Sequence, residues 1–121
     1  MSIVSYTFLT QPKDRKELLM ADIVRVLSLA SGKLWMDEII AEMNSFRETL
    51  ERGEPFSEKD LRNSIKALEA LDTVTTEERV AATGGNPKRT RLVGLRYSVP
   101  LRNLLQLDAD TRKYRAIASS Q

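Results

Sequence analysis

Four polar side chains follow one another at helical spacing in the middle of the chain, and all four are hydrogen-bond donors. They are Lys59, Arg62, Asn63 and Lys66, whose i, i+3, i+4, i+7 spacing places them on one outward stripe of a helix. The guanidinium of Arg62 and the amide of Asn63 can each form two parallel hydrogen bonds, as in the recognition of guanine and adenine. The lysines are point charges suited to phosphates, and Ser57 with the first amides of the helix can add donors to a phosphate. The stripe predicts a nucleic-acid contact, with ordinary solvated side chains as the alternative.

The second candidate is the segment TGGNPKRTR, residues 83–91, which holds Lys88, Arg89 and Arg91 at a predicted hairpin tip. Its glycines allow a narrow turn that can approach another backbone closely. Arg89 can then enter a minor groove while Lys88 and Arg91 bind flanking phosphates. A hairpin kept soluble by its charges is the alternative. No acidic residue occurs from position 80 to 107, and solubility does not require a single sign of charge, so the segment favours an anionic partner.

The composition is that of a small globular protein. Its 121 residues fit one domain, and 41% hydrophobic with 30% charged residues is typical of soluble proteins. The absence of cysteine and histidine excludes disulfides, thiolate chemistry and the commonest general base. No stretch is long enough to cross a bilayer, and the N-terminus lacks the features of a secretory signal. We therefore expect a cytoplasmic protein with no membrane partner.

No sequence pattern predicts an enzyme. Ser31-Gly32-Lys33 resembles the end of a phosphate-binding loop, but the first glycine of that loop is missing because position 27 is Leu. Adjacent acidic pairs such as Asp37-Glu38 point to different sides of a helix or strand, so they make no shared acid–base site. We expect no catalytic residue, no cofactor and no metal site.

The elements that would position the candidate residues follow from hydrophobic periodicity and breaker residues. Ser57 and Asp60 fit a capping box at the start of one helix, and Trp35, in the extended connector KLW, is expected to anchor the core. The expected elements are an extended arm (4–8), helices (12–31, about 37–53 and 57–71), a hairpin (strands 73–82 and 90–99 around the turn 83–89) and a last helix (100–118).

This order of elements resembles a winged helix-turn-helix domain over residues 14–99. The resemblance rests on LWMDEIIAEM as the second helix with its lead-in and on SEKDLRNSIKALEALDTVTTEERV as the third helix running into the wing. Within the latter, IKALEALDTV is similar to the end of the third helix in MarR- and PadR-type regulators, with Asp72 and Thr73 where a small residue is usual. The expected class is mainly α with a small antiparallel hairpin (α+β). We expect a single domain over 1–121, with an N-terminal arm (1–11), a winged-helix core (12–99) and a C-terminal helix with a tail (100–121).

The resemblance implies a function for both candidate segments. The helix at 57–71 would enter the major groove of duplex DNA, and the hairpin would be a basic wing. We expect a dimeric DNA-binding regulator of transcription, joined mainly by the C-terminal helix, with the N-terminal arm as a further candidate contact. Two other functions stay open: a winged-helix module that binds proteins in a transcription or replication assembly, and a non-specific nucleic-acid-binding protein.

Overall fold

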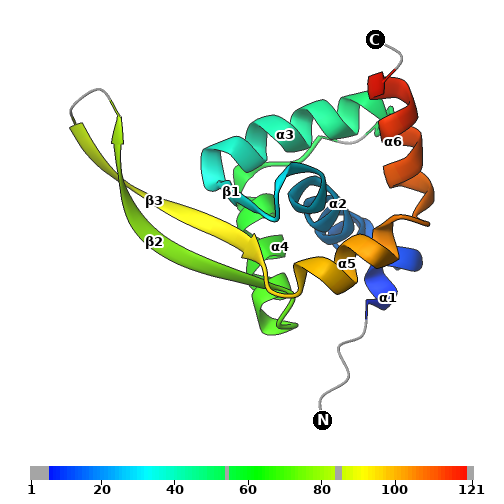
Figure 1. The fold of residues 1–121 in the computed structure, drawn as a ribbon, viewed down its shortest axis with the longest axis horizontal. Coiled ribbons are helices and arrows are strands. Elements are labelled where there is room, and N and C mark those ends of the chain that lie inside the picture. Colours follow the sequence, from blue (N-terminus) through cyan, green and yellow to red (C-terminus); the bar gives the residue numbers. More distant parts are fainter. Residues whose placement is uncertain (1–5, 54, 84–85, 120–121) are drawn as a thin grey trace.

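The structure, a computed structural model, describes residues 6–53, 55–83 and 86–119, and gives the side chains of these residues except at 81–83 and 86–89. The chain is mainly helical with a small antiparallel sheet, which confirms the expected α+β class (Figure 1). The elements are α1 (Thr7–Thr10), α2 (Arg15–Ala30), β1 (Lys33–Trp35), α3 (Met36–Thr49), α4 (Glu58–Ala70), β2 (Val74–Thr83), β3 (Asn86–Leu95), α5 (Ser98–Leu105) and α6 (Ala109–Ser119).

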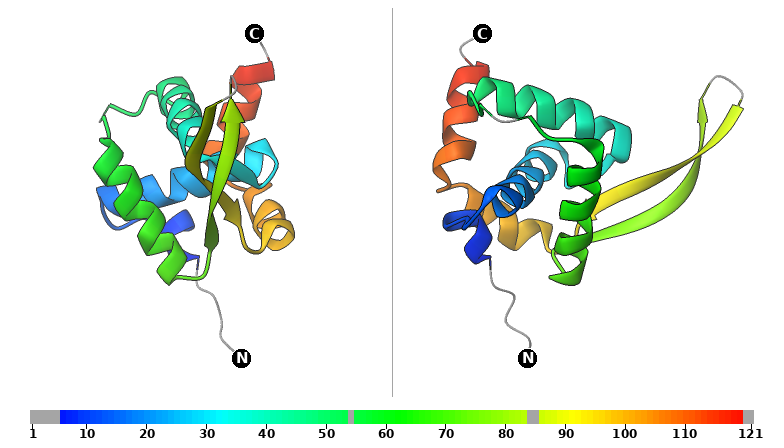
Figure 2. Two further views of the ribbon diagram at one scale, coloured as in Figure 1. Left: turned by 90° about the vertical axis from the view of Figure 1, so that its left-hand side faces the viewer. Right: turned by 180° about the vertical axis from the view of Figure 1, so that it is seen from behind.

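Helix α2 lies at the centre of the molecule, with the other helices packed around it (Figures 1 and 2). It begins after Asp14, whose carboxylate accepts a hydrogen bond of 2.9 Å from the Glu17 amide, so the helix starts three residues later than predicted. Gly32 follows its last turn with a φ of 92°, a conformation that glycine adopts without strain, which confirms the predicted stop. Ile23, Val24 and Leu27 are completely buried, so α2 supplies the middle of the core.

The sheet has the strand order β1-β3-β2, and its long β2–β3 hairpin projects from the helical body (Figure 2). The predicted connector KLW forms β1 and pairs with β3, with Leu34 opposite Val93. The predicted role of Trp35 was wrong: both Leu34 and Trp35 are partly buried, but Leu34 is the one of the two that packs against the core. Successive residues of a strand face opposite sides, so one of the two must turn away from the core.

The predicted turn at residues 83–89 was too long. Strand β2 continues to Thr83 and β3 begins at Asn86, so Pro87 belongs to β3 and pairs with Ala82. Proline is compatible with this part of β3 because β1 pairs only with residues 92–94, which leaves one side of the strand without a partner there. At its other end β3 stops at Leu95, four residues before the predicted end, and Tyr97 and Val99 are exposed.

Both ends of the chain also differ from the prediction. Residues 7–10 form the short helix α1 with Phe8 and Leu9 buried, whereas residues 1–5 of the predicted arm lie outside the described part. The predicted last helix is divided into α5 and α6, because Asp108 starts a second helix by accepting a 2.9 Å hydrogen bond from the Thr111 amide. Within the described residues, no helix combines the length and the apolar character needed to span a membrane.

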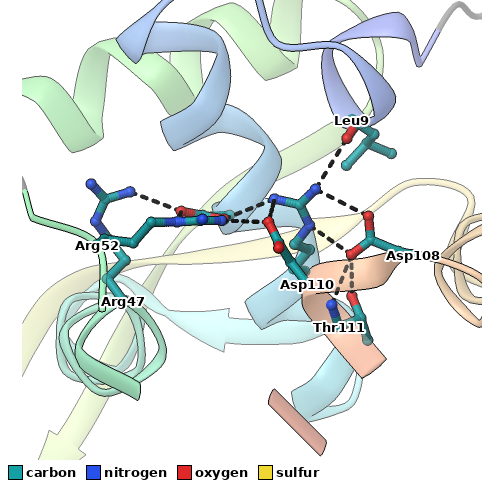
Figure 3. Close-up of polar contacts among 8 residues, drawn as sticks. Leu9, Arg47, Arg52, Asp108, Asp110 and Thr111 are labelled. Atoms are coloured by element: carbon teal, nitrogen blue, oxygen red, sulfur yellow. Dashed lines mark hydrogen bonds and ion pairs between the residues drawn. The ribbon is translucent and has the colours of Figure 1, made fainter. Parts of the chain in front are cut away.

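A buried cluster of charges joins the ends of the chain to the centre (Figure 3). Asp22 on α2 is completely buried, and its carboxylate lies 2.9 Å from Arg25, 2.8 Å from Arg47 and 3.0 Å from Arg52. Arg52 also lies 2.6 Å from Asp110. Such a cluster is stable only when each desolvated charge has partners, and here every member is paired.

Arg25 connects this cluster to the junction of α5 and α6. Its guanidinium donates two hydrogen bonds to Asp108, of 2.9 and 3.0 Å, and a third to the Leu9 carbonyl of α1. Burial by itself lowers the pKa of Arg25, but the hydrogen bonds and charges of Asp108 and Asp22 outweigh it and raise that pKa. The cluster thereby fixes α1, α2 and the start of α6 relative to one another.

Asp108 makes the stability of the fold sensitive to acid. Burial by itself raises the pKa of Asp108, but hydrogen bonds from Arg25 and Thr111 outweigh it and hold this pKa below its ordinary value of 3.8. A carboxyl whose pKa is depressed in the folded state stabilises that state above its unfolded pKa and loses this contribution as the pH falls through the folded one.

We therefore expect the free energy of unfolding to fall as the pH drops below about 4. Urea titrations between pH 7 and 2 check this, with Asp108→Asn as the comparison. The variant should be less stable at pH 7 and lose less stability on acidification. An identical acid dependence of the two proteins would assign the effect to other carboxyls.

Candidate nucleic-acid interface

Helix α4 is positioned by the capping box that the sequence predicts. The Ser57 hydroxyl accepts a hydrogen bond of 3.0 Å from the Asp60 amide, and the Asp60 carboxylate accepts one of 3.1 Å from the Ser57 amide. These hydrogen bonds lower the pKa of Asp60. On the inner side of the helix, Leu61, Ile65 and Leu68 are buried in the core, which sets the rotation of α4 about its axis.

This rotation leaves the predicted stripe on the outer side. Lys59, Arg62, Asn63 and Lys66 are all exposed, and Ser57 is exposed at the N-terminal end of the helix. Arg62 has a partner that the prediction did not assign to it, because its guanidinium lies 2.7 Å from the Glu58 carboxylate. Both side chains of this pair are more than half exposed, so the pair is worth less than about 1 kcal/mol and can be exchanged for another partner.

A groove of about 450 Å³ lies between α4, the start of α3 and β3; we call it the hairpin groove. It brings Arg62 and Lys66 of α4 together with Thr90 and Arg91 of β3, on one surface. The remaining residues of its lining are Met36, Asp37 and Glu58. The two candidate segments, which are separate in the sequence, thus share one groove through Arg91.

The other two predicted cations of the hairpin are placed by the backbone alone. Strand register sets Arg89 opposite Val80 and Lys88 opposite Ala81, and the side chains of Lys88 and Arg89 lie outside the described part of the structure. Arg91, whose side chain is exposed, pairs in register with Glu78 on β2. Of these three cations, Arg91 therefore has an acid opposite it on β2, whereas Arg89 and Lys88 lie opposite apolar residues.

Two further cations, Arg79 within the hairpin and Arg96 directly after it, do not line the groove. Arg79 lies 2.7 Å from Glu77 within β2. Arg96 lies 3.3 Å from Asp72, and its pKa is raised by a hydrogen bond with Tyr97 and by the charge of Asp72. Residues 80–107 contain no acid, but cations of this stretch can pair with acids from other segments, as Arg96 does with Asp72. Counting charges along the sequence therefore overstates the positive charge that is available to an anion.

Sequence reasoning missed the residues that α3 contributes to the hairpin groove. Met36 and Asp37 form the first turn of α3, directly after β1, and β1 pairs with β3. The signal in the sequence was the extended connector KLW, whose pairing with β3 in the structure places this turn beside the hairpin. Among the described residues, no group of three or more acidic, cysteine or histidine side chains is arranged to hold a metal ion.

The geometry suits recognition by hydrogen bonds and charge. The exposed stripe offers a bidentate guanidinium, an amide and ammonium groups, and the hairpin adds a further guanidinium to the same groove.

No protein-family model matches this chain, and no curated protein matches its sequence.

Proposed function

We propose that this chain is a winged-helix protein that binds duplex DNA and regulates transcription. In this proposal α4 is the recognition helix and the β2–β3 hairpin is the wing. The observation that carries the proposal is the hairpin groove, in which Arg62 and Lys66 of α4 lie on the same surface as Arg91 of β3. A winged-helix domain uses these two elements together, the helix in the major groove and the hairpin along the flanking backbone.

Each residue has a role in the proposal that follows from its side chain. Arg62 donates two hydrogen bonds to a guanine, and Asn63 pairs with an adenine. Lys59, Lys66, Lys88 and Arg91 contact phosphates, and Arg89 enters a minor groove. Ser57 and the first amides of α4 add donors to a phosphate. The protein acts by occupying its site or recruiting other proteins there, with no chemical step.

A homodimer is part of the proposal. The buried Leu101 and Leu105 cover α2 within the chain, so the apolar inner face of α5 is already occupied. Val99, Leu104 and Leu107 are exposed and remain for a two-fold contact. Sedimentation equilibrium at high micromolar concentration tests this: a dimer mass supports the contact, and a monomer mass contradicts it.

The acids of the hairpin groove favour a second candidate function, a module that binds protein. Asp37 and Glu58 disfavour the dense charge of phosphates, and in this function the cations of α4 and the hairpin would meet an acidic protein partner. A third candidate, non-specific binding to nucleic acid, would rest on the hairpin and make Arg62 and Asn63 replaceable.

A titration of the wild-type protein with random-sequence duplex DNA and with polyglutamate separates these functions. If four to six phosphates are neutralised, the logarithm of the association constant should fall with the logarithm of salt concentration with a slope of about −4 to −5. Binding to polyglutamate alone would favour the protein-binding module, and binding to neither would contradict an anionic partner.

A further inference from the structure

A second groove runs along the other side of α4, between α4 and the first turns of α2. It measures about 590 Å³ and we call it the α2 groove. Its lining includes Arg15, Lys16 and Leu19 of α2 and Asn63, Ser64 and Lys66 of α4, with Asp60 and Ala67 completing it. None of the α2 residues has a role in the sequence-based interface or in the hairpin groove.

The α2 groove is cationic. Arg15, Lys16 and Lys66 supply three positive charges against the single carboxylate of Asp60. This carboxylate is already engaged by the Ser57 amide and lies 3.8 Å from Arg15. Arg15 also donates to the Pro55 carbonyl, which holds its side chain across the gap between α2 and the start of α4. Lys16 and Lys66 are exposed in this groove, so the charge that these two lysines present to a partner is positive.

One wall of the groove contains a further polar group. Ser64 is 1% exposed, and within the described residues its hydroxyl has no hydrogen-bond partner. Buried hydroxyls are normally hydrogen-bonded, so the Ser64 hydroxyl is an unusual polar group in the wall of this groove.

The two grooves lie on either side of α4 and share one lining residue. Lys66 lines both of them, and Asn63, which neighbours Arg62 on the exposed stripe, lines the α2 groove. Helix α4 is thus a ridge between two grooves that both contain cations. The major groove of B-DNA is about 12 Å wide, similar to the diameter of a helix with its side chains, and is bordered by the backbones of both strands.

We propose that Arg15 and Lys16 bind the sugar-phosphate backbone on the side of the major groove opposite the hairpin. One DNA strand then lies along the hairpin groove and the other along the α2 groove, so the duplex is held on both sides of α4. This inference rests on the proposed DNA-binding function and adds to it a second backbone contact, made by the first turn of α2.

The test compares Lys16→Ala and Lys16→Glu with the wild type in titrations of duplex DNA at about 50, 100 and 200 mM salt. Lys113→Ala is the matched control, because Lys113 is an exposed lysine on α6 and lines neither groove. Lys16→Ala should reduce the salt slope by about 1 and weaken binding to all sequences alike. Lys16→Glu should weaken it further, and Lys113→Ala should leave it unchanged.

The outcomes separate this inference from the proposed function. If the wild type binds and Lys16→Ala behaves like Lys113→Ala, the α2 contact is wrong while DNA binding stands. If the wild type does not bind duplex DNA at all, the proposed function fails and the inference fails with it. Melting temperatures of the variants confirm folding, which an exposed lysine in the first turn should not disturb.

Discussion

Replacing Asp22 by alanine is expected to lower the free energy of unfolding by about 3–5 kcal/mol, because it removes the one carboxylate that pairs with all three desolvated arginines of the cluster. Asp22 is completely buried, and Arg25 and Arg47, which are 3% and 6% exposed, both depend on its carboxylate. The change alters the cluster from three arginines and three aspartates to three arginines and two aspartates. Buried guanidinium groups keep their charge, so they cannot escape this cost by losing a proton.

Urea denaturation at neutral pH measures the effect. Glu48→Ala is the control, because Glu48 is an exposed acid on α3 and its loss should change stability by less than about 0.5 kcal/mol. A loss below about 1 kcal/mol for Asp22→Ala would mean that water or rearranged side chains compensate the arginines, and would contradict a tightly coupled cluster.

Replacing Arg62 by alanine is expected to cost about 1–3 kcal/mol of binding free energy at one base position and to relax selectivity there. A bidentate guanidinium specifies guanine because its two parallel hydrogen bonds match the spacing and direction of the O6 and N7 acceptors, which a phosphate contact does not require. Arg62 is exposed and must break its ion pair with Glu58 before it can bind the base. The cost of breaking that pair reduces the binding free energy that Arg62 contributes.

Competition titrations check this, with a selected site and with duplexes changed at one base pair each. Lys59→Ala is the comparison: as a phosphate contact it should weaken every duplex alike. If Arg62→Ala also weakens every duplex alike, α4 does not read sequence, and non-specific binding replaces the proposed function.

Local patterns predicted most of the fold. The capping box of Ser57 and Asp60, the stop at Gly32 and the apolar periodicity of the core helices all depend on residues within a few positions of one another. The predictions failed where tertiary contacts decide. Tyr6 and Phe8 alternate as in a strand, yet Phe8 and Leu9 are both buried in a short helix against α2.

The charge cluster lay beyond sequence reasoning for the same reason. Asp22 and Arg52 are 30 positions apart, and Arg25 and Asp108 are 83 positions apart. A charge count treats Arg25, Arg47 and Arg52 as available cations, although each is paired with the buried Asp22. The break before α6 did have a local signal, since Asp108 precedes Thr111 by the three positions of a helix cap.

The candidate interface was predictable in part. Periodicity placed Lys59, Arg62, Asn63 and Lys66 on the exposed side of α4, because the buried residues of that helix fix its rotation. The grooves on either side were not predictable. They depend on how α2 and the start of α3 pack beside α4, and no local pattern specifies that packing.

The most direct test of the central claim is a titration of random-sequence duplex DNA at about 50 and 200 mM salt with three proteins. These are the wild type, the hairpin variant Lys88/Arg89/Arg91→Ala, and the control Arg112/Lys113/Arg115→Ala, which removes the same residue types from the exposed side of α6. We expect salt-sensitive binding by the wild type and the control, and a salt slope smaller by about 2 to 3 in the hairpin variant. Equal losses in both variants, or no binding at low salt, would contradict a DNA interface built from α4 and the hairpin.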